Sequence, residues 1–413
     1  MKKILSVFSV AAALAFTACA PTKQTEDLSW AKNAIDRASY QLALQAETFK
    51  DSALLPRSIK NGIVRAEDSK EWIKNGSVRL EGPKDWTSGF FPGSLWYQYE
   101  LTGDTAFKSY ATYYTHLLEE LQHYTGTHDL GFMMFCSYGN ELRLAHDTAV
   151  VAPILVNTAK SLSSRFSEKT GTIRSWDFGP WSYPVIIDNM MNLELLFWAS
   201  NYSGDDTFKN VAVKHADVTM ANHFRPDYSS YHVISYDTIT GGVESKGTFQ
   251  GFADESAWAR GQAWGVYGYT VMYRFTQDQK YLDQAKHIAA YIMNHPMKTE
   301  DLIPYWDYNA PNIPDAPRDA SAAAVTACAL LEMSQIVENG QEYFDFAEKI
   351  LKNLSTPAYL AEKDENGGFI LKHSVGHLPA GSEIDTPLNY ADYYYLEGLK
   401  RYLDIKGIDS KTL

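Results

Sequence analysis

A turn between two helical segments recurs along this chain, with apolar residues at a fixed spacing after it. The four turns are Thr102-Gly103-Asp104, Ser203-Gly204-Asp205, Thr276-Gln277-Asp278 and Glu338-Asn339-Gly340. After the second residue of each turn, an aromatic residue follows at the fourth position and an alanine at the eighth. This spacing places both side chains on one face of a helix. Gly, Asp and Asn at the turn supply the caps that end one helix and begin the next.

The segments on the two sides of these turns differ in polarity. Strongly apolar segments precede the turns, over residues 90–101, 185–200, 258–275 and 320–337. More charged segments follow them, such as Tyr281–Asn294. A buried helix followed by an amphipathic helix, repeated along the chain, predicts helical hairpins in two layers. Strand-like alternation is confined to Tyr231–Tyr236 and the neighbourhood of residues 368–371.

The pattern therefore predicts an all-α fold, an (α/α)6 barrel with an inner and an outer ring of helices. The alternative is a helical protein of two domains, but no Pro-, Ser- or Gly-rich linker interrupts the chain. We expect one catalytic domain over residues 28–413. With 413 residues, of which 45% are apolar, the chain can fill a core of that size.

Charge excludes one class of partner. The 37 basic and 50 acidic residues give a formal net charge of −13. No run of Lys and Arg offers the stripe that neutralises phosphates, so we expect no binding to nucleic acid. A small anionic ligand would need one or two cationic groups inside its pocket.

The first residues have the pattern of an export signal, which we assign to residues 1–19. Lys2 and Lys3 precede an apolar stretch over residues 4–16, which is too short to span a membrane. Cys19, directly after Thr17-Ala18, is expected to carry a lipid, with residues 20–27 as a tether. The alternative is plain cleavage near Ala18 or Ala20. The expected location is outside the cytoplasm of a bacterium, in the periplasm or on a membrane through the lipid anchor.

Two other cysteines, Cys136 and Cys328, lie among apolar residues. Their spacing suits no zinc site, and we expect two buried free thiols. The histidines form no ligand constellation either, so no metal or other cofactor is expected.

Two aspartates are the main candidates for chemistry. Asp129 opens one strongly apolar segment, and Asp188 enters another. An apolar setting raises the pKa of a carboxyl, because burial disfavours the charged form. Such a carboxyl can hold a proton near neutral pH, as a proton-donating catalyst requires.

The densest cluster of polar and aromatic residues lies over residues 247–264. A loop flanked by glycines leads there to Trp258, Arg260, Gln262 and Trp264. Trp rings stack on the apolar faces of sugars, while Gln and Arg meet hydroxyls or a carboxylate. Either tryptophan taken singly suits a core position equally well. A buried Arg260 requires either a structural carboxylate or an anionic ligand, because an unpaired buried charge is costly.

Four blocks in this order, residues 85–93, 128–132, 187–193 and 258–264, resemble the signature blocks of unsaturated glucuronyl hydrolases, glycoside hydrolase family 88. The likeness covers residues 30–400. It implies an (α/α)6 barrel acting on oligosaccharides that carry a 4,5-unsaturated uronic acid at the non-reducing end. By this resemblance Asp188 is the general acid and base, and Asp129 is the second essential carboxylate. The positions that match the family's substrate pocket are Trp86, His128, Trp176, His232, Gln250, Trp258, Arg260 and Trp264.

The resemblance also implies the reaction. The C4=C5 bond of such a substrate is an enol ether, so a protonated Asp188 can deliver a proton to C4 and then activate the water that adds at C5. The expected substrates are lyase-generated fragments of glycosaminoglycans. A related unsaturated rhamnogalacturonyl hydrolase acting on pectin fragments is the nearest alternative. A sugar epimerase or isomerase and a non-catalytic glycan-binding lipoprotein are further ones.

Overall fold

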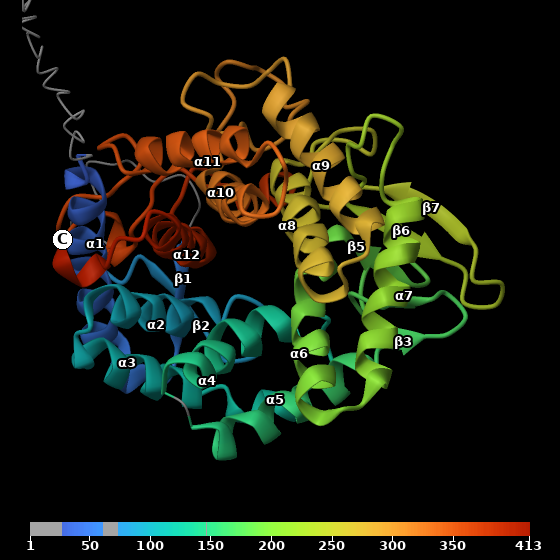
Figure 1. Cartoon of the computed structure of the whole chain (residues 1–413), viewed down its shortest axis with the longest axis horizontal. Helices are drawn as coiled ribbons and strands as arrows, with labels where there is room; N and C mark the ends of the chain where they lie inside the picture. Colours follow the sequence, from blue (N-terminus) through green and yellow to red (C-terminus); the bar gives the residue numbers. More distant parts are fainter. Residues whose placement is uncertain (1–26, 61–72, 146) are drawn as a thin grey trace, which may run out of the picture.

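Two concentric rings of helices make up the computed structural model, which describes residues 27–60, 73–145 and 147–413 (Figure 1). The inner ring holds α2 (Phe90–Thr102), the π-helix η4 (Gly131–Gly139) with α4 (Asn140–Ala145), α6 (Leu193–Ser203), α8 (Ala259–Thr276), α10 (Ala320–Ser334) and α12 (Asn389–Ile405). The outer ring holds α1 (Ser29–Phe49), α3 (Thr105–His116), α5 (Thr148–Ser163), α7 (Asp206–Asn222), α9 (Gln279–Asn294) and α11 (Gly340–Leu354). Contacts between α12 and α2 close the inner ring. This architecture confirms the predicted (α/α)6 barrel.

The recurring turns join an inner helix to the next outer helix, as the pattern predicts. Gly103, Gly204 and Gln277 take left-handed φ angles of 74°, 74° and 55° and end α2, α6 and α8. The side chains of Asp104 and Asp205 then accept hydrogen bonds from the amides of Ala106 and Thr207, the second residues of α3 and α7. The aromatic residues after these turns, such as Phe107 and Phe208, are buried.

The fourth turn is built differently. Asn339 makes no side-chain cap, and Gly340 begins α11 so close to α10 that a Cβ would lie 1.9 Å from the Ser334 carbonyl oxygen. Close approach of the backbones, rather than a left-handed conformation, is what requires glycine here.

The predicted helix over residues 185–200 is wrong in its first half. Residues Pro184–Ile186 form strand β5, and Ile187–Asn192 form a 3-10 helix, η5, before α6 begins. Strand β5 pairs with β6 (Val233–Tyr236), which pairs with β7 (Val243–Gly247), and all pairs are antiparallel. Because apolar residues buried on both faces suit strand and helix alike, the sequence could not separate the two.

The remaining strands form two short antiparallel pairs, β1 (Leu55–Ile59) with β2 (Val78–Glu81) and β3 (Phe166–Ser167) with β4 (Thr172–Ile173). Strand β6 bears out the strand expected over Tyr231–Tyr236. The expected strand near residues 368–371 reduces to one bridge between Leu360 and Leu371.

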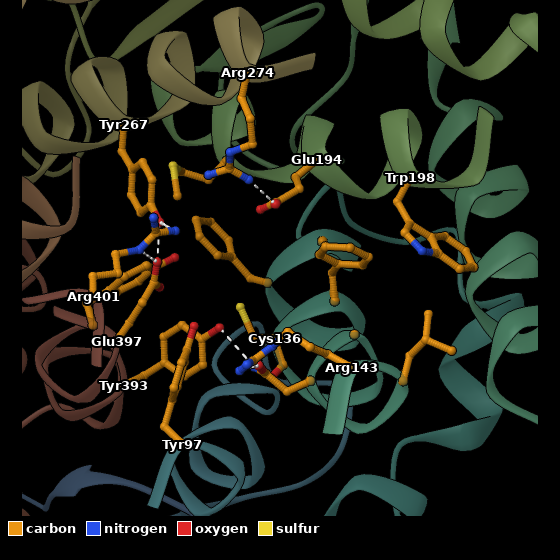
Figure 2. A pocket seen from close by; sticks show the side chains of 18 of the residues that line it. Tyr97, Cys136, Arg143, Glu194, Trp198, Tyr267, Arg274, Tyr393, Glu397 and Arg401 are labelled. Atoms are coloured by element: carbon orange, nitrogen blue, oxygen red, sulfur yellow. Dashed lines mark hydrogen bonds and ion pairs between the residues drawn. The ribbon is translucent and has the colours of Figure 1, made fainter. Parts of the chain in front are cut away.

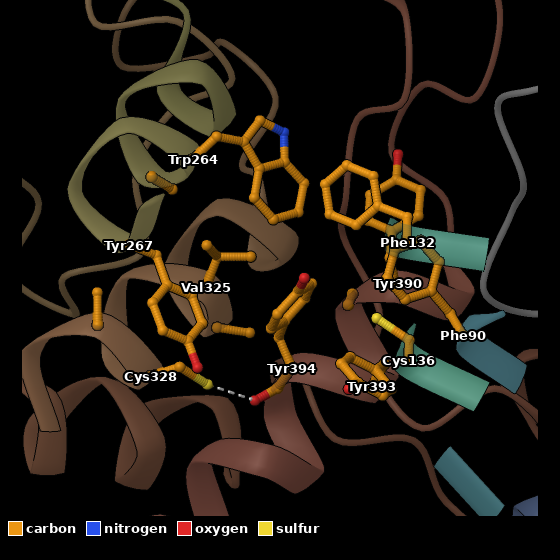
Figure 3. Packing of buried hydrophobic residues seen from close by; sticks show 14 of the residues in the cluster. Phe90, Phe132, Cys136, Trp264, Tyr267, Val325, Cys328, Tyr390, Tyr393 and Tyr394 are labelled. Atoms are coloured by element: carbon orange, nitrogen blue, oxygen red, sulfur yellow. Dashed lines mark hydrogen bonds between the residues drawn. The ribbon is translucent and has the colours of Figure 1, made fainter. Parts of the chain in front are cut away.

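A layer of aromatic rings fills the barrel axis (Figure 3). The ring of Phe132 lies 5.4 Å from Phe90 and 5.0 Å from Trp264, and Trp264 lies 5.4 Å from Tyr394. Cys136 and Cys328 are buried and free, as predicted. The layer separates two cavities, one at each end of the inner helices.

The first of these, which we call the distal cavity, lies toward the C-terminal ends of the inner helices and measures about 490 Å³ (Figure 2). Paired charges line it. Arg274 contacts Glu194 and Arg401 contacts Glu397, and both arginines also contact Glu332, which does not itself line the cavity. Cationic side chains near helix C-termini offset the negative end of the helix dipole.

None of the helices in the described ranges is long and apolar enough to cross a membrane. The expected export signal with Cys19, and the tether up to residue 26, lie outside the described residues.

Candidate active site

The second cavity, of about 390 Å³, lies at the opposite end of the barrel, where the inner helices begin. Loops leading into several inner helices meet here. Among the predicted site residues, those that line it are Trp86, His128, Asp129, Trp176, Asp188 and Gln250. The two candidate catalytic aspartates therefore share one cavity wall.

A close approach of two backbone segments brings the aspartates together. The amide of Phe132, in η4, donates a 2.9 Å hydrogen bond to the side-chain oxygen of Asn192, in η5. A Cβ on Gly131 would lie 2.6 Å from the Asn192 Cα, so only glycine permits this contact. Asp129 lies two residues before the start of η4 and Asp188 lies in η5, which sets both carboxyls at the same mouth.

Asp188 is 5% exposed, and its Oδ2 has no hydrogen-bond partner among the described residues. Burial raises the pKa of this carboxyl to about 7; Arg260 opposes the rise, and the neighbouring Asp129 adds to it. An acid with that pKa can donate a proton near neutral pH.

Asp129 is held differently. The Thr127 hydroxyl donates a 2.6 Å hydrogen bond to Oδ2, and His128 Nε2 lies 3.2 Å from Oδ1. Burial raises the pKa of Asp129 to about 7, against the hydrogen bond from Thr127. Burial also lowers the pKa of His128 to about 3, so this ring is neutral at physiological pH. The hydrogen bond from Thr127 favours the ionised form of Asp129. Oδ2 of Asp188 accepts no such hydrogen bond.

His232 lies behind Asp188 and does not line the cavity. Its Nδ1 accepts hydrogen bonds from the amides of Phe249 and Gln250, at 3.0 and 3.2 Å. Because a nitrogen that accepts cannot carry hydrogen, the hydrogen of the neutral ring is on Nε2. Nε2 lies 3.6 Å from Asp188 Oδ2. Burial lowers the pKa of His232 well below its usual value.

Arg260, which the resemblance places in the substrate pocket, does not line this cavity. Its guanidinium donates to Asp319 Oδ2 at 3.0 Å, to the Val375 carbonyl and to the Gly376 carbonyl at 2.7 Å. Of the two alternatives that the sequence left open, the structure supplies the carboxylate partner. Arg260 thus anchors the loop around residue 376, which itself reaches the cavity.

Trp258 and Trp264 are also absent from the cavity wall. Trp258 is 2% exposed and packs on the Arg260 guanidinium and on His232, with centroid distances of 4.3 and 4.8 Å. Trp264, at 0% exposure, lies more than one helical turn inside α8, in the aromatic layer. The position of a side chain along the helix decides whether it reaches the cavity or lies in the core. The spacing of residues in the sequence does not give this position relative to the cavity.

The sequence reasoning missed several residues that line the cavity. Arg57 of β1 donates to both carboxylate oxygens of Glu383, at 2.8 and 3.0 Å, and to Asp85 Oδ2 at 2.6 Å. Glu383 takes a positive φ of 54°, and a Cβ on Gly376 would lie 2.3 Å from its Oε2. These residues lie far apart in the chain, and no motif connects them. Within the described ranges, no cluster of three His, Cys, Asp or Glu side chains is arranged to hold a metal ion.

A helical barrel with two buried carboxyls and aromatic rings at one mouth is the architecture of a carbohydrate-active enzyme. Residues 61–404 match the family model described as Glycosyl Hydrolase Family 88, and residues 1–66 match a model described as a domain of unknown function. The chain belongs to glycosyl hydrolase family 88.

Individual relatives agree with this assignment. The chain is 51% identical to an unsaturated glucuronyl hydrolase of Formosa agariphila over 84% of each chain. It is 32% identical to an unsaturated chondroitin disaccharide hydrolase of Streptococcus pneumoniae, covering 89% of this chain and 91% of that one. The solved structure of an unsaturated glucuronyl hydrolase specific for heparin is 53% identical, with a TM-score of 0.88, over 93% of this chain and all of that one.

Proposed function

We propose that this enzyme releases a 4,5-unsaturated uronic acid from the non-reducing end of lyase-generated glycosaminoglycan fragments. Relatives named as unsaturated glucuronyl hydrolases and as an unsaturated chondroitin disaccharide hydrolase support this activity. The observation that carries the mechanism is the state of Asp188. It is a buried carboxyl at the cavity wall, with a pKa raised to about 7 by burial and an oxygen free of hydrogen bonds within the described chain.

Asp188 acts in two steps. The protonated carboxyl first transfers its proton to C4 of the substrate, and positive charge develops at C5 and the ring oxygen. The ionised carboxyl then takes a proton from the water that adds at C5. The resulting hemiketal opens, expels the neighbouring sugar and leaves a 4-deoxy-5-keto uronate. One residue serves as acid and then as base, so the reaction is the hydration of a vinyl ether, unlike hydrolysis by two carboxylates.

Burial raises the pKa of both carboxyls to about 7, and we assign the negative charge of the pair to Asp129, because Thr127 donates a hydrogen bond to it and no described group donates to Oδ2 of Asp188. The hydrogen bond from Thr127 stabilises the negative charge of Asp129, which orients the hydroxyls of the uronate ring. Its charge also raises the proton affinity of Asp188, because two neighbouring carboxylates repel each other.

The test is an assay of the purified chain on unsaturated disaccharides from glycosaminoglycan lyases and from pectin lyases. Each turnover removes the alkene, so the ultraviolet absorbance of the conjugated double bond falls. We expect turnover of the glycosaminoglycan products and a loss of roughly a thousandfold or more in Asp188→Asn, the upper part of the usual range for general acid–base catalysis. Near-normal rates in a folded Asp188→Asn variant would remove Asp188 from this role, and preference for pectin fragments would overturn the substrate class.

We also propose that the enzyme is exported and carries a lipid on Cys19. The support is the basic and apolar start of the chain and the Thr17-Ala18-Cys19 sequence. In cells fed radiolabelled palmitate, the full chain is expected to incorporate label and Cys19→Ser to incorporate none. Equal labelling of the two would contradict lipidation at this cysteine.

A further inference from the structure

The distal cavity lies at the end of the barrel opposite the two aspartates and takes no part in the proposed reaction (Figure 2). Its volume of about 490 Å³ falls within the range of roughly 300–1,000 Å³ that small-molecule sites occupy. We propose that the distal cavity binds a neutral sugar of one or two pyranose rings. This inference goes beyond the proposed function and does not depend on it.

Aromatic rings give the distal cavity flat apolar surfaces on different sides (Figure 2). Trp198 of α6 and Phe135 of η4 form one pair, with ring centroids 6.1 Å apart. Tyr97 of α2 and Tyr393 of α12 form another pair, 5.3 Å apart. The C–H faces of a pyranose are apolar, and aromatic rings bind such faces by stacking. The cavity can therefore hold a sugar ring by its faces.

One of these aromatic surfaces continues to the outside of the protein. Tyr202 stacks on Trp198, with centroids 5.2 Å apart and planes inclined by 9°, and 51% of Tyr202 is exposed. Contiguous apolar surface is typical of binding sites, whereas single exposed apolar residues are ordinary. The stacked pair thus extends the cavity wall toward solvent, where a ligand would enter.

The charges of the distal cavity select against an anionic ligand, because each arginine that lines it is already paired. The ion pairs are those of Arg274 with Glu194 and Glu332, of Arg401 with Glu332 and Glu397, and of Arg143 with Glu100. An anionic ligand could bind one of these arginines only by displacing its carboxylate. The displaced carboxylate would lose its partner in a partly buried setting, at a cost in free energy. A ligand without charge avoids this cost.

The same ion pairs leave hydrogen-bond acceptors open at the cavity wall. Glu194 accepts from Arg274 through Oε1, and Glu397 accepts from Tyr267 and Arg401 through Oε1. In the described part of the chain, no hydrogen bond reaches Oε2 of either glutamate. Sugar hydroxyls can donate to such oxygens, and hydrogen bonds to an ionised acceptor are among the strong ones. Open carboxylate oxygens beside aromatic faces therefore match the hydroxyls and the C–H faces of a neutral sugar.

The test is a calorimetric titration of the purified chain with cellobiose, a neutral disaccharide with flat C–H faces. We expect saturable binding with a dissociation constant of about 1 mM or tighter. Trp198→Ala should weaken this binding by roughly two- to tenfold, the value of one aromatic contact, and Trp198→Phe should keep most of the affinity. Leu142→Trp adds bulk at the cavity wall and removes no aromatic ring, and it should also weaken binding.

Trp176→Ala is the matched control, because Trp176 lines the other cavity. This variant should bind cellobiose with the wild-type affinity. A second titration uses cellobiouronic acid, in which one primary alcohol of cellobiose is replaced by a carboxylate. Any binding of this anion should be unaffected by Trp198→Ala, since the paired arginines exclude it from the distal cavity.

Three results would overturn the proposal: no saturable binding of cellobiose to the wild type, an unchanged affinity in either distal variant that keeps its melting temperature, or a loss of affinity confined to Trp176→Ala. Equal dependence of both disaccharides on Trp198 would overturn the selection for a neutral ligand. Failure of the proposed function would appear in the hydrolysis assay instead, because these titrations contain no unsaturated substrate.

Discussion

His232 Nε2 lies 3.6 Å from Asp188 Oδ2, and both atoms are buried without a hydrogen-bond partner in the described part of the chain. The opposite nitrogen of His232 accepts from two backbone amides, so Nε2 carries the hydrogen. If either side chain moved by about 1 Å or less, Nε2 of His232 would donate a hydrogen bond to Oδ2 of Asp188. The imidazole is thus placed to stabilise Asp188 when it has given up its proton.

This geometry predicts the effect of removing the imidazole. In His232→Leu, the ionised form of Asp188 loses its donor, so the pKa of Asp188 rises and the alkaline limb of the pH–rate profile moves to higher pH. The maximal rate should fall about tenfold or more, since a hydrogen bond to a charged group contributes about 1.5–3 kcal/mol. His232→Gln, which keeps an acceptor and a donor, should recover part of the rate. A Leu variant with a lower rate but an unmoved profile would make His232 a purely structural residue.

The pH dependence of the wild-type enzyme follows from Asp188. Its pKa is raised to about 7 by burial, so the general acid is protonated below about pH 7 and loses its proton above it. We expect kcat/KM to fall as pH rises through this region. In Asp129→Asn the neighbouring negative charge is absent, the pKa of Asp188 falls, and the alkaline limb moves to lower pH. A limb that stays in place in a folded Asp129→Asn enzyme would show that the two carboxyls do not interact.

Replacing Arg260 separates an anchoring role from direct contact with substrate. Lysine offers no fork of donors to reach Asp319 and the carbonyls of Val375 and Gly376 together. Arg260→Lys should therefore lower the free energy of unfolding by roughly 2–4 kcal/mol, as expected when a buried ion pair is disrupted. Thermal unfolding measures this loss. An unchanged melting temperature with a raised KM would instead place Arg260 in contact with the substrate.

We expect the charges around the distal cavity to contribute to stability and not to catalysis. Burial alone would raise the pKa of Glu332, but the hydrogen bond from Arg274 and the charges of Arg274 and Arg401 hold it below its usual value. Glu332→Gln should destabilise the fold by roughly 2–4 kcal/mol at neutral pH. Because a lowered pKa favours the folded state only where the carboxyl is ionised, the wild-type advantage should vanish as pH falls into the acid range.

Two readouts check this prediction. Chemical unfolding at several pH values compares Glu332→Gln with Glu342→Gln, whose side chain is exposed and should leave stability unchanged within about 0.5 kcal/mol. The kcat/KM of folded Glu332→Gln should stay near wild type, since the aromatic layer separates the two cavities. A large loss of activity at full stability would connect the distal cavity to the reaction.

The spacing of turn, aromatic and alanine residues was enough to predict the hairpins and the barrel. Local chemistry accounts for this success: Gly103 and Gly204 end their helices in the left-handed region, and Asp104 and Asp205 cap the next ones. Asp129 and Asp188 could be found in the same way, because a carboxyl inside an apolar run stands out in any sequence. Their roles in the reaction remain predictions that the experiments above test.

The tertiary structure alone decided which side chains reach the cavity. Trp258, Arg260 and Trp264 lie close together in the sequence, yet one packs on an arginine, one pairs with Asp319 and one joins the barrel core. Arg57 and Glu383 form an ion pair although most of the chain lies between them in the sequence. The ring of Phe178 stacks on Trp176, and Gly179 allows the turn that brings them together. Helix spacing is a local property that the chain carries in its own order of residues. Depth in a barrel and contact between distant loops arise only when all the hairpins close on one another.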